Sequence, residues 1–313
     1  LRLGNQVFMW GESGAFDSQI NIANPLIVSR LWLPGGSEDE ARAAIPALSA
    51  SWKSASGWKV EGFYGFAYRS TEAYPFGTFL SGNDYYTTGA SQIFVSTGNP
   101  LLDAVLGNTV ARGPDRKTND QGGGVQVRSA EIGGDLRATV GVYGGRFSAT
   151  EPIVGATIGS VLGPLGNFAT TSRYFVEQAI KVPVAGFSLK LHPSQTNQLR
   201  MDFSVRRNNP LQVDDREIIS GVQLLGACAA TGDPAACGAA DLNKVVNRQT
   251  GGVPLTQVGA IGLAGTDISG ASRHDLSQLI VGFTQGLPNF FGSKLVLIDI
   301  EHVLQSLASY DPA

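Results

Sequence analysis

The stretch QLRMDFSVR, residues 198–206, decides the fold class because apolar and polar residues alternate along its whole length. One set of side chains is apolar and the other is charged or polar: Leu199, Met201, Phe203 and Val205 against Arg200, Asp202, Ser204 and Arg206. Successive side chains of a β-strand point to opposite faces, so a period of two predicts a strand with two unlike faces.

The same period recurs at residues 58–69, 136–144 and 294–302. In the last of these, the apolar residues Val296, Ile298 and Ile300 oppose Leu297, Asp299 and Glu301. Turn residues join neighbouring strands: a glycine pair at 133–134 and a Pro-Asn turn at 288–289 each predict a hairpin. The chain is therefore expected to form an antiparallel sheet.

Helical spacing is confined to residues 37–50, SEDEARAAIPALSA. Ser37 can cap a helix, acidic residues fill its first turn, and Pro46 limits its length. We expect one short helix there, and we treat residues 20–50 as a helical or inward-folded insert.

The composition of the 313 residues narrows the class of protein. Charged residues make up 16% of the chain against roughly 25% in average proteins, and the net charge is −3. That charge gives no basic field for nucleic acid. Strongly apolar runs of 18 or more residues are missing, so a helical membrane protein is excluded. A charge-poor, glycine-rich, sheet-forming chain remains.

Two all-β architectures share this alternation: a soluble sandwich and a transmembrane barrel. A barrel with a water-containing lumen needs strands of about 9 to 11 residues whose polar face is charged. Residues 70–122 and 207–272 are predicted to be long loops, too long for a compact sandwich. These features favour an antiparallel outer-membrane β-barrel, one domain over residues 1–313. A soluble secreted β domain is the alternative.

The barrel prediction assigns the two faces of the strands. The polar residues Arg200, Asp202 and Arg206 are expected to line the lumen. The apolar residues are expected to face lipid, and so are those of the last strand: Leu199, Met201, Phe203, Val205, Val296, Ile298 and Ile300.

The only cysteines, Cys228 and Cys237, lie in CAATGDPAAC on either side of a Gly-Asp-Pro turn. In an oxidising compartment such a pair can close a surface loop with a disulfide. Two loose thiols are the other interpretation. Two ligands alone make a poor metal site.

Two short motifs carry the remaining candidate residues. WGES, Trp10 to Ser13, is interpreted as a strand end followed by a turn, with a luminal ligand contact by Glu12 as the alternative. RGPDR is a turn-like cluster in which Arg112 and Arg116 are expected to pair with Asp115 or with luminal acids and so pin an inward-folded segment. Contact with an anionic substrate is the other role considered for it.

Catalytic and cofactor-binding motifs are not evident. His274, Asp275 and Ser277 cannot form a relay on one strand, because His274 points to the opposite face from the other two. GxSxG and phosphate-loop motifs are missing from the sequence. We therefore expect neither an enzyme nor a bound metal or cofactor.

Two connections are rich in small and apolar residues: 152–172 and 251–265. The first carries no charge and spaces glycines four apart, a spacing that allows close packing. We interpret both as connections that pack into the barrel mouth or onto a partner. A conduit for apolar solutes would need such surfaces, although simple loop packing explains them as well.

Five phrases occur in order along the chain: LRLGNQVFMWGES, INIANPLIVSRLWLPG, PFGTFLSGND, RGPDR and HDLSQLIVGFTQ. Together they resemble the proteobacterial outer-membrane family numbered 1302 among the domains of unknown function. The resemblance runs from Leu1 to about Glu301 and is weak across 215–272. It implies a Gram-negative outer-membrane β-barrel, with a signal peptide and some strands upstream of Leu1.

The resemblance also implies a role and partners. Genes of the family often lie beside an RND-type inner-membrane transporter and a periplasmic protein with a lipid-carrier-like fold. The implied role is transport of hydrophobic compounds or lipids across the envelope, in contact with outer-membrane lipids. A barrel that conducts nothing and serves as a structural scaffold is the alternative function.

Overall fold

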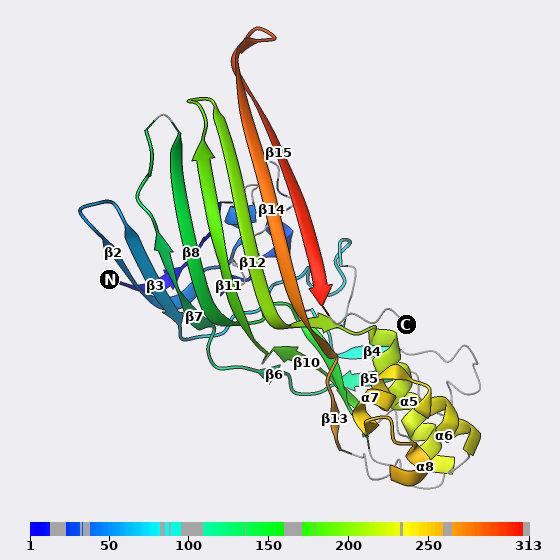
Figure 1. Cartoon of the computed structure of the whole chain (residues 1–313). Coiled ribbons are helices and arrows are strands. Elements are labelled where there is room, and N and C mark those ends of the chain that lie inside the picture. Colours follow the sequence, from blue (N-terminus) through cyan, green and yellow to red (C-terminus); the bar gives the residue numbers. More distant parts are fainter. Residues whose placement is uncertain are drawn as a thin grey trace.

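The computed structural model describes residues 1–12, 23–31, 33, 38–81, 85–87, 89–94, 109–134, 136–159, 171–178, 180–231, 234–258 and 265–308. Strands predominate and form two sheets, beside which a helical unit packs (Figure 1). Ser13 and Ser37, and the middle of both apolar connections, lie outside these residues. Within them, no helix is both long and apolar enough to cross a membrane.

The large sheet has nine strands, and every neighbouring pair is antiparallel, as the hairpin signals predict. In spatial order they are β1 (Arg2–Gln6), β2 (Ile45–Lys53), β3 (Lys59–Gly65), β7 (Gly122–Arg128), β8 (Arg137–Ser148), β11 (Lys181–His192), β12 (Asn197–Gln212), β14 (Ala271–Phe290) and β15 (Ser293–Ala308). The sheet is open: β1 and β15 are its edges and, among the described residues, do not pair with each other.

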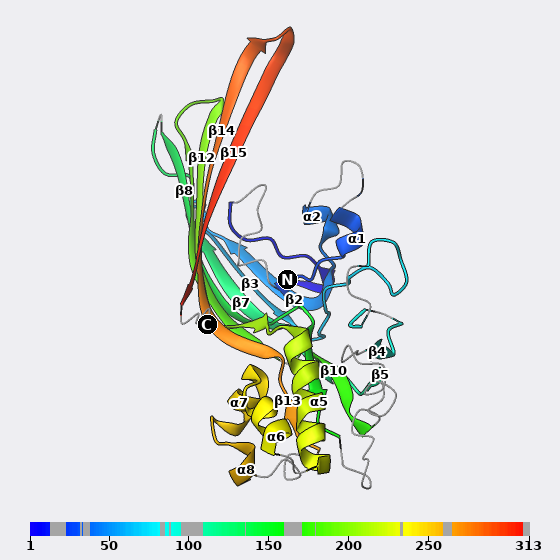
Figure 2. The same cartoon turned by 90° about the vertical axis from the view of Figure 1, so that its right-hand side faces the viewer.

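The two ends of the large sheet differ in their connections. At one end the strands are joined by short turns, and the longest hairpin, β14 with β15, extends beyond the others (Figure 1). At the other end lie the long segments 66–121, 149–180 and 213–270, which build the second sheet and the helical unit. Seen edge-on, the sheet is curved, with helices α1 (Val28–Leu31) and α2 (Glu38–Ala41) on its concave side (Figure 2).

The second sheet is smaller and mixed. Its order is β13 (Asp267–Ile268), β9 (Ile153–Thr157), β10 (Arg173–Gln178), β5 (Thr109–Arg112) and β4 (Gln92–Phe94), and β6 (Arg116–Lys117) also pairs with β10. The start of the apolar stretch 152–172 is thus β9, a central strand of this sheet. Similarly, 70–122 supplies three strands where a loop was predicted.

The prediction of a long loop over 207–272 is wrong. Strand β12 continues to Gln212, and four helices follow: α5 (Asp215–Thr231), α6 (Pro234–Asp241), α7 (Lys244–Thr250) and α8 (Leu255–Val258). Asn243 caps α7 by accepting hydrogen bonds from two backbone N–H groups, and Gly251 ends it in the left-handed conformation. Ile218, Val222 and Leu225 of α5 pack in one core with Ala156 of β9. Their spacing of three to four residues is the apolar stripe of an amphipathic helix.

Two further expectations are corrected. In the described part of the predicted helix, residues 38–50, only Glu38–Ala41 is helical, because β2 begins at Ile45 and buries Ile45 and Ala47 in the core of the large sheet. The predicted Pro-Asn turn is part of a strand, because Pro288 pairs with Leu295. The chain reverses at Phe291 and Gly292, both at positive φ.

Candidate functional site

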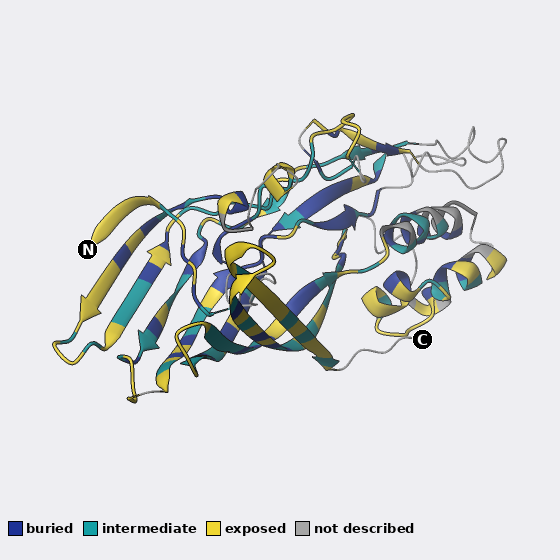
Figure 3. Cartoon of the chain, turned by 90° about the horizontal axis from the view of Figure 1, so that it is seen from above, coloured by how far each residue is buried: buried dark blue, intermediate teal, exposed yellow. Residues whose placement is uncertain are grey.

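The register of the large sheet places the alternating residues on two distinct faces. We call the face that contacts residues 7–12 the inner face and the opposite one the outer face. Phe203 pairs with Phe187 and Leu279, and Met201 pairs with Leu189 and Val281, so these side chains share the outer face. Seen from above, buried and exposed residues alternate along several of the strands (Figure 3).

The seven residues expected to face lipid all lie on the outer face. Leu199 pairs with Phe283, which pairs with Ile300, so one apolar row crosses three strands. Ile300 is 62% exposed and Ile298 is 43% exposed. Other large apolar side chains of this face are also exposed: Leu48, Trp52, Val125, Val140, Val142, Val281, Phe283 and Leu304. We call this surface the apolar belt.

Residues 7–12, which we call the inner segment, leave β1 and cross the inner face. The rings of Phe8 and Phe63 stack in parallel with centroids 3.7 Å apart, and Trp10 meets Phe63 edge-on at 5.2 Å. The backbone N–H of Phe8 donates to Asn24 Oδ1 at 2.8 Å, and Asn24 donates to the carbonyl of Ala43. The described part of WGES, Trp10 to Glu12, therefore continues across the sheet after the strand has ended at Gln6.

Glu12 ties the end of the inner segment to three strands. Its carboxylate pairs with Arg128 of β7 and lies 3.5 Å from Lys190 of β11. Its backbone N–H donates to Asp202 Oδ2 of β12 at 2.8 Å. The side chain of Glu12 is only 8% exposed, so this carboxylate is a buried junction. A Cβ on Gly11 would lie 3.0 Å from Asp202 Oδ1, so the glycine permits this close approach.

The predicted luminal residues extend this network on the inner face. Arg200 pairs with Asp299 at 2.7 Å and with Glu301 at 3.0 Å, both on β15. Lys190 of β11 pairs with Arg200 of β12 in the sheet register, so these two cations are neighbours on the inner face. Arg206 is buried and donates to Asn209. We call Glu12, Arg128, Lys190, Arg200, Asp202, Asp299 and Glu301 the inner charged cluster.

An apolar patch lies on the same inner face, next to the charged cluster and beneath the inner segment. It is lined by Ile45, Ala47, Phe63, Tyr143, Phe147, Val182 and Val184. Two of the rings approach glycines closely. A Cβ on Gly124 would be 2.8 Å from Phe147 Cζ, and one on Gly186 would be 2.8 Å from Tyr143 Cζ. Glycine at these positions therefore lets aromatic rings pack close to the backbone of the sheet.

RGPDR stabilises the second sheet, away from the inner charged cluster. Arg112 donates two hydrogen bonds to Asp115, and Arg116 donates two to Asp267 of β13. Arg116 also lies 4.8 Å over the ring of Phe175 on β10. The expected pairing of Arg112 with Asp115 is present, whereas the partner of Arg116 belongs to the second sheet instead of the lumen.

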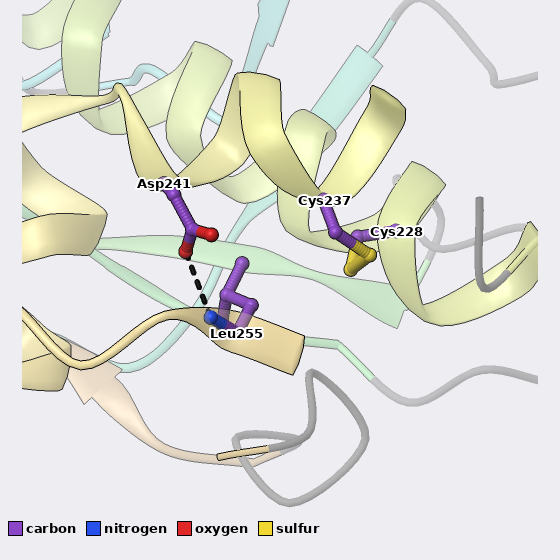
Figure 4. Close-up of a disulfide and its surroundings, with 4 residues drawn as sticks. All are labelled: Cys228, Cys237, Asp241 and Leu255. Atoms are coloured by element: carbon purple, nitrogen blue, oxygen red, sulfur yellow. Dashed lines mark hydrogen bonds between the residues drawn. A yellow bond between two sulfur atoms is a disulfide. The ribbon is translucent and has the colours of Figure 1, made fainter. Parts of the chain in front are cut away.

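Cys228 and Cys237 form a disulfide that joins α5 to α6 (Figure 4). Both cysteines are buried in the core of the helical unit. Close by, Asp241 accepts a hydrogen bond from the backbone N–H of Leu255 at 2.9 Å. The bridge therefore connects two packed helices instead of closing the surface loop that the Gly-Asp-Pro turn predicts.

Alternation in the sequence singles out Arg200 and Asp202, and the WGES motif singles out Glu12, but neither pattern identifies Arg128, Lys190 or Phe63. These residues lie on three different strands, and only the register of the sheet brings them together. The signal available in the sequence was weak: Arg128 is the last residue of a glycine-rich strand, and Lys190 is one of two lysines on its strand.

The described residues contain no group of three or more His, Cys, Asp or Glu that could hold a metal ion. His274 contacts Ser272, with Nε2 and Oγ 2.7 Å apart. Asp275 accepts from the backbone N–H of Asn208. These two side chains thus have separate partners.

The chain belongs to the family described as "Protein of unknown function (DUF1302)", whose model matches residues 1–311. No curated protein and no solved structure matches it. The family resemblance carried by the five phrases is confirmed.

Proposed function

We propose that the large sheet is the wall of a Gram-negative outer-membrane β-barrel that transports hydrophobic compounds or lipids. One observation carries the proposal: the exposed apolar belt on one face of the sheet lies opposite a face with a charged cluster and a covered apolar patch. An RND-type inner-membrane transporter and a periplasmic lipid carrier are the partners we propose for it.

The apolar belt supports a membrane location. Soluble monomers rarely expose contiguous apolar patches larger than a few hundred Å². Here apolar side chains protrude from neighbouring strands of one sheet, including Trp52, Val142 and Ile300. Lipid contact removes the cost of exposing such a face to water, and strands with one apolar and one polar face are typical of outer-membrane barrels.

Closure is a requirement of this proposal. An unpaired strand edge in hydrocarbon leaves backbone N–H and C=O groups without partners, at several kcal/mol each. Both β1 and β15 must therefore be paired, with each other or with further strands, when the wall is in the membrane.

The inner apolar patch supports a hydrophobic cargo. A porin for polar solutes keeps its interior polar. In this chain Phe63, Phe147 and Val184 form an apolar surface on the inner face, and the inner segment covers it. Displacement of the inner segment would open an apolar path along the wall.

A non-conducting scaffold is the second candidate, and the contacts of Glu12 favour it. The inner segment is bound to β7, β11 and β12 by charged groups, which is the arrangement expected of a permanent plug. The two functions differ in whether the inner segment moves.

Cell fractionation tests the membrane location. We expect the protein in the outer-membrane fraction, released only by detergent, with a gel mobility that changes on heating. Recovery in the soluble fraction without detergent would overturn the proposal and leave the soluble β domain.

Passage of an apolar fluorescent dye into proteoliposomes tests transport. Trp10→Ala removes a ring that packs on Phe63, so we expect the inner segment to loosen and dye entry to rise several-fold. Trp58→Ala is the matched control, because Trp58 is half-exposed beside the β2 to β3 turn. If wild type and both variants show only background entry of the dye, the scaffold function is favoured.

A further inference from the structure

A hollow of about 640 Å³ lies on the outer face of the large sheet, close to the end where the long connections begin. Its floor is made of glycines from β3 and β7, and charged and aromatic side chains surround it. The lining residues are Gly62, Phe63, Tyr64, Asp120, Gly122, Gly123, Gly124, Val125, Arg146 and Lys181. Neither the inner segment nor the inner charged cluster contributes to it.

The register explains why the wall is hollow here. Gly123 of β7 pairs with Tyr64 of β3 on one side and with Arg146 of β8 on the other. The three residues share the outer face, and the middle one has no side chain. In the next row Val125 lies between Gly62 and Gly144, so this valine also stands apart from other side chains and is 52% exposed.

The charges around the hollow leave one cation available. Asp120 accepts a hydrogen bond from Tyr64 Oη at 2.6 Å and one from Lys181 Nζ at 2.6 Å. These bonds, chiefly the one from Lys181, lower the pKa of Asp120, so its carboxylate is ionised at neutral pH and neutralises Lys181. Arg146 is exposed and, among the described residues, has no carboxylate within ion-pair distance.

The surface next to the hollow is apolar. Beyond Val125, the following outer row consists of Val60, Val127, Val142 and Phe187 on four adjacent strands. A cation and a phenol ring thus lie at the edge of an apolar surface. This arrangement fits an amphiphile whose anionic group binds at the edge and whose hydrocarbon chains lie along the apolar belt. Arginine is well suited to a phosphate, which it can bind through two parallel hydrogen bonds.

We propose that this hollow binds the phosphate group of a membrane lipid, with Arg146 as the phosphate ligand and the lipid chains lying over Val125 and Val142. The inference rests on the proposed membrane location of the wall. It does not depend on whether the barrel conducts.

Native mass spectrometry of the detergent-purified protein with added dioleoyl phosphatidylglycerol tests the site. We expect wild type to retain one more lipid molecule than Arg146→Gln at the same lipid concentration. The fraction of Arg146→Lys that carries this lipid should lie between the two. Arg248→Gln is the matched control, because Arg248 is an exposed arginine on α7, and it should behave as wild type. Heat-modifiable gel mobility of each variant verifies folding.

Three outcomes would overturn the proposal. In the first two, Arg146→Gln retains phosphatidylglycerol as well as wild type does, or wild type retains phosphate-free dioleoylglycerol as well as it retains phosphatidylglycerol. In the third, millimolar inorganic phosphate displaces the lipid completely. The last would identify a site for free phosphate. A protein that fractionates as soluble would instead contradict the membrane location, so the two failures are distinguishable.

Discussion

Single residues hold the inner segment in place, and Glu12 shows how. Its carboxylate is the acidic partner between Arg128 and Lys190, while its backbone is held by Asp202. Sequence alone indicated a turn at WGES, because a Trp-Gly-Glu-Ser phrase after a strand is a local signal. The partners of Glu12 are more than a hundred residues away along the chain. Alternation predicts which face of the sheet a residue occupies, but it does not predict which residue lies beside it on the neighbouring strand.

Glu12→Gln should loosen the inner segment. The amide keeps the shape but removes the charge between two cations at a buried position, so we expect a loss of about 2 kcal/mol in the local stability of residues 7–12. Hydrogen exchange of these backbone amides measures it. Glu131→Gln is the control, since its pair with Arg137 is half-exposed and contributes under about 1 kcal/mol. Equal effects of the two substitutions would mean that Glu12 does not hold the segment.

The two faces of the large sheet can be compared on adjacent residues. Ala50 and Ser51 of β2 are both small and exposed, and they point to opposite faces. Ala50→Arg places a charge in the apolar belt, at a cost of up to about 2–4 kcal/mol in lipid. Ser51→Arg faces Glu61 on the inner side and should be tolerated. Yield of heat-modifiable protein in the outer membrane measures insertion, and equal yields would contradict the assignment of faces.

At the scale of elements, alternation predicted strands and hairpins well where the strands are long. β12 and β15 include the predicted ranges 198–206 and 294–302, and the Gly133 turn joins β7 to β8. The second sheet was not predictable in this way: its strands have two to six residues, too short to show a period. The helices of 215–258 were missed because their stripe of apolar residues lies among many alanines and glycines, which hide it.

The turn between β14 and β15 has an unusual residue for its conformation. Phe291 has a φ of +50° and Gly292 has a φ of +75°, the pattern of a two-residue turn that favours Asn-Gly. Phe291 is 90% exposed, and its ring meets the neighbouring ring of Phe290 edge-on with centroids 4.3 Å apart. Phe291→Asn should stabilise the hairpin by about 1 kcal/mol, because asparagine adopts positive φ more readily. Hydrogen exchange of β14 measures it, and Gly292→Val should act in the opposite direction.

At the scale of the whole molecule, the chain has separate cores. One lies on the inner face of the large sheet and includes Phe63 and Phe147, and another joins the second sheet to the helical unit and includes Ile218 and Leu255. Sequence suggested a single domain because both units share the same glycine-rich, charge-poor composition. The contacts between β12 and β9 include Gln212, whose side chain bonds to both the backbone N–H and the C=O of Val154.

Separate cores predict separate unfolding transitions, only one of which depends on the disulfide. Cys228→Ala with Cys237→Ala removes a short cross-link within the helical unit, so we expect that unit to lose about 2–3 kcal/mol. The core on the inner face contains neither cysteine and should keep its transition temperature. Thermal unfolding followed by helical and strand signals separates the two, with reductant-treated wild type as the matched control. A single transition that shifts as a whole would mean that Gln212 and its neighbours couple the two cores into one cooperative unit.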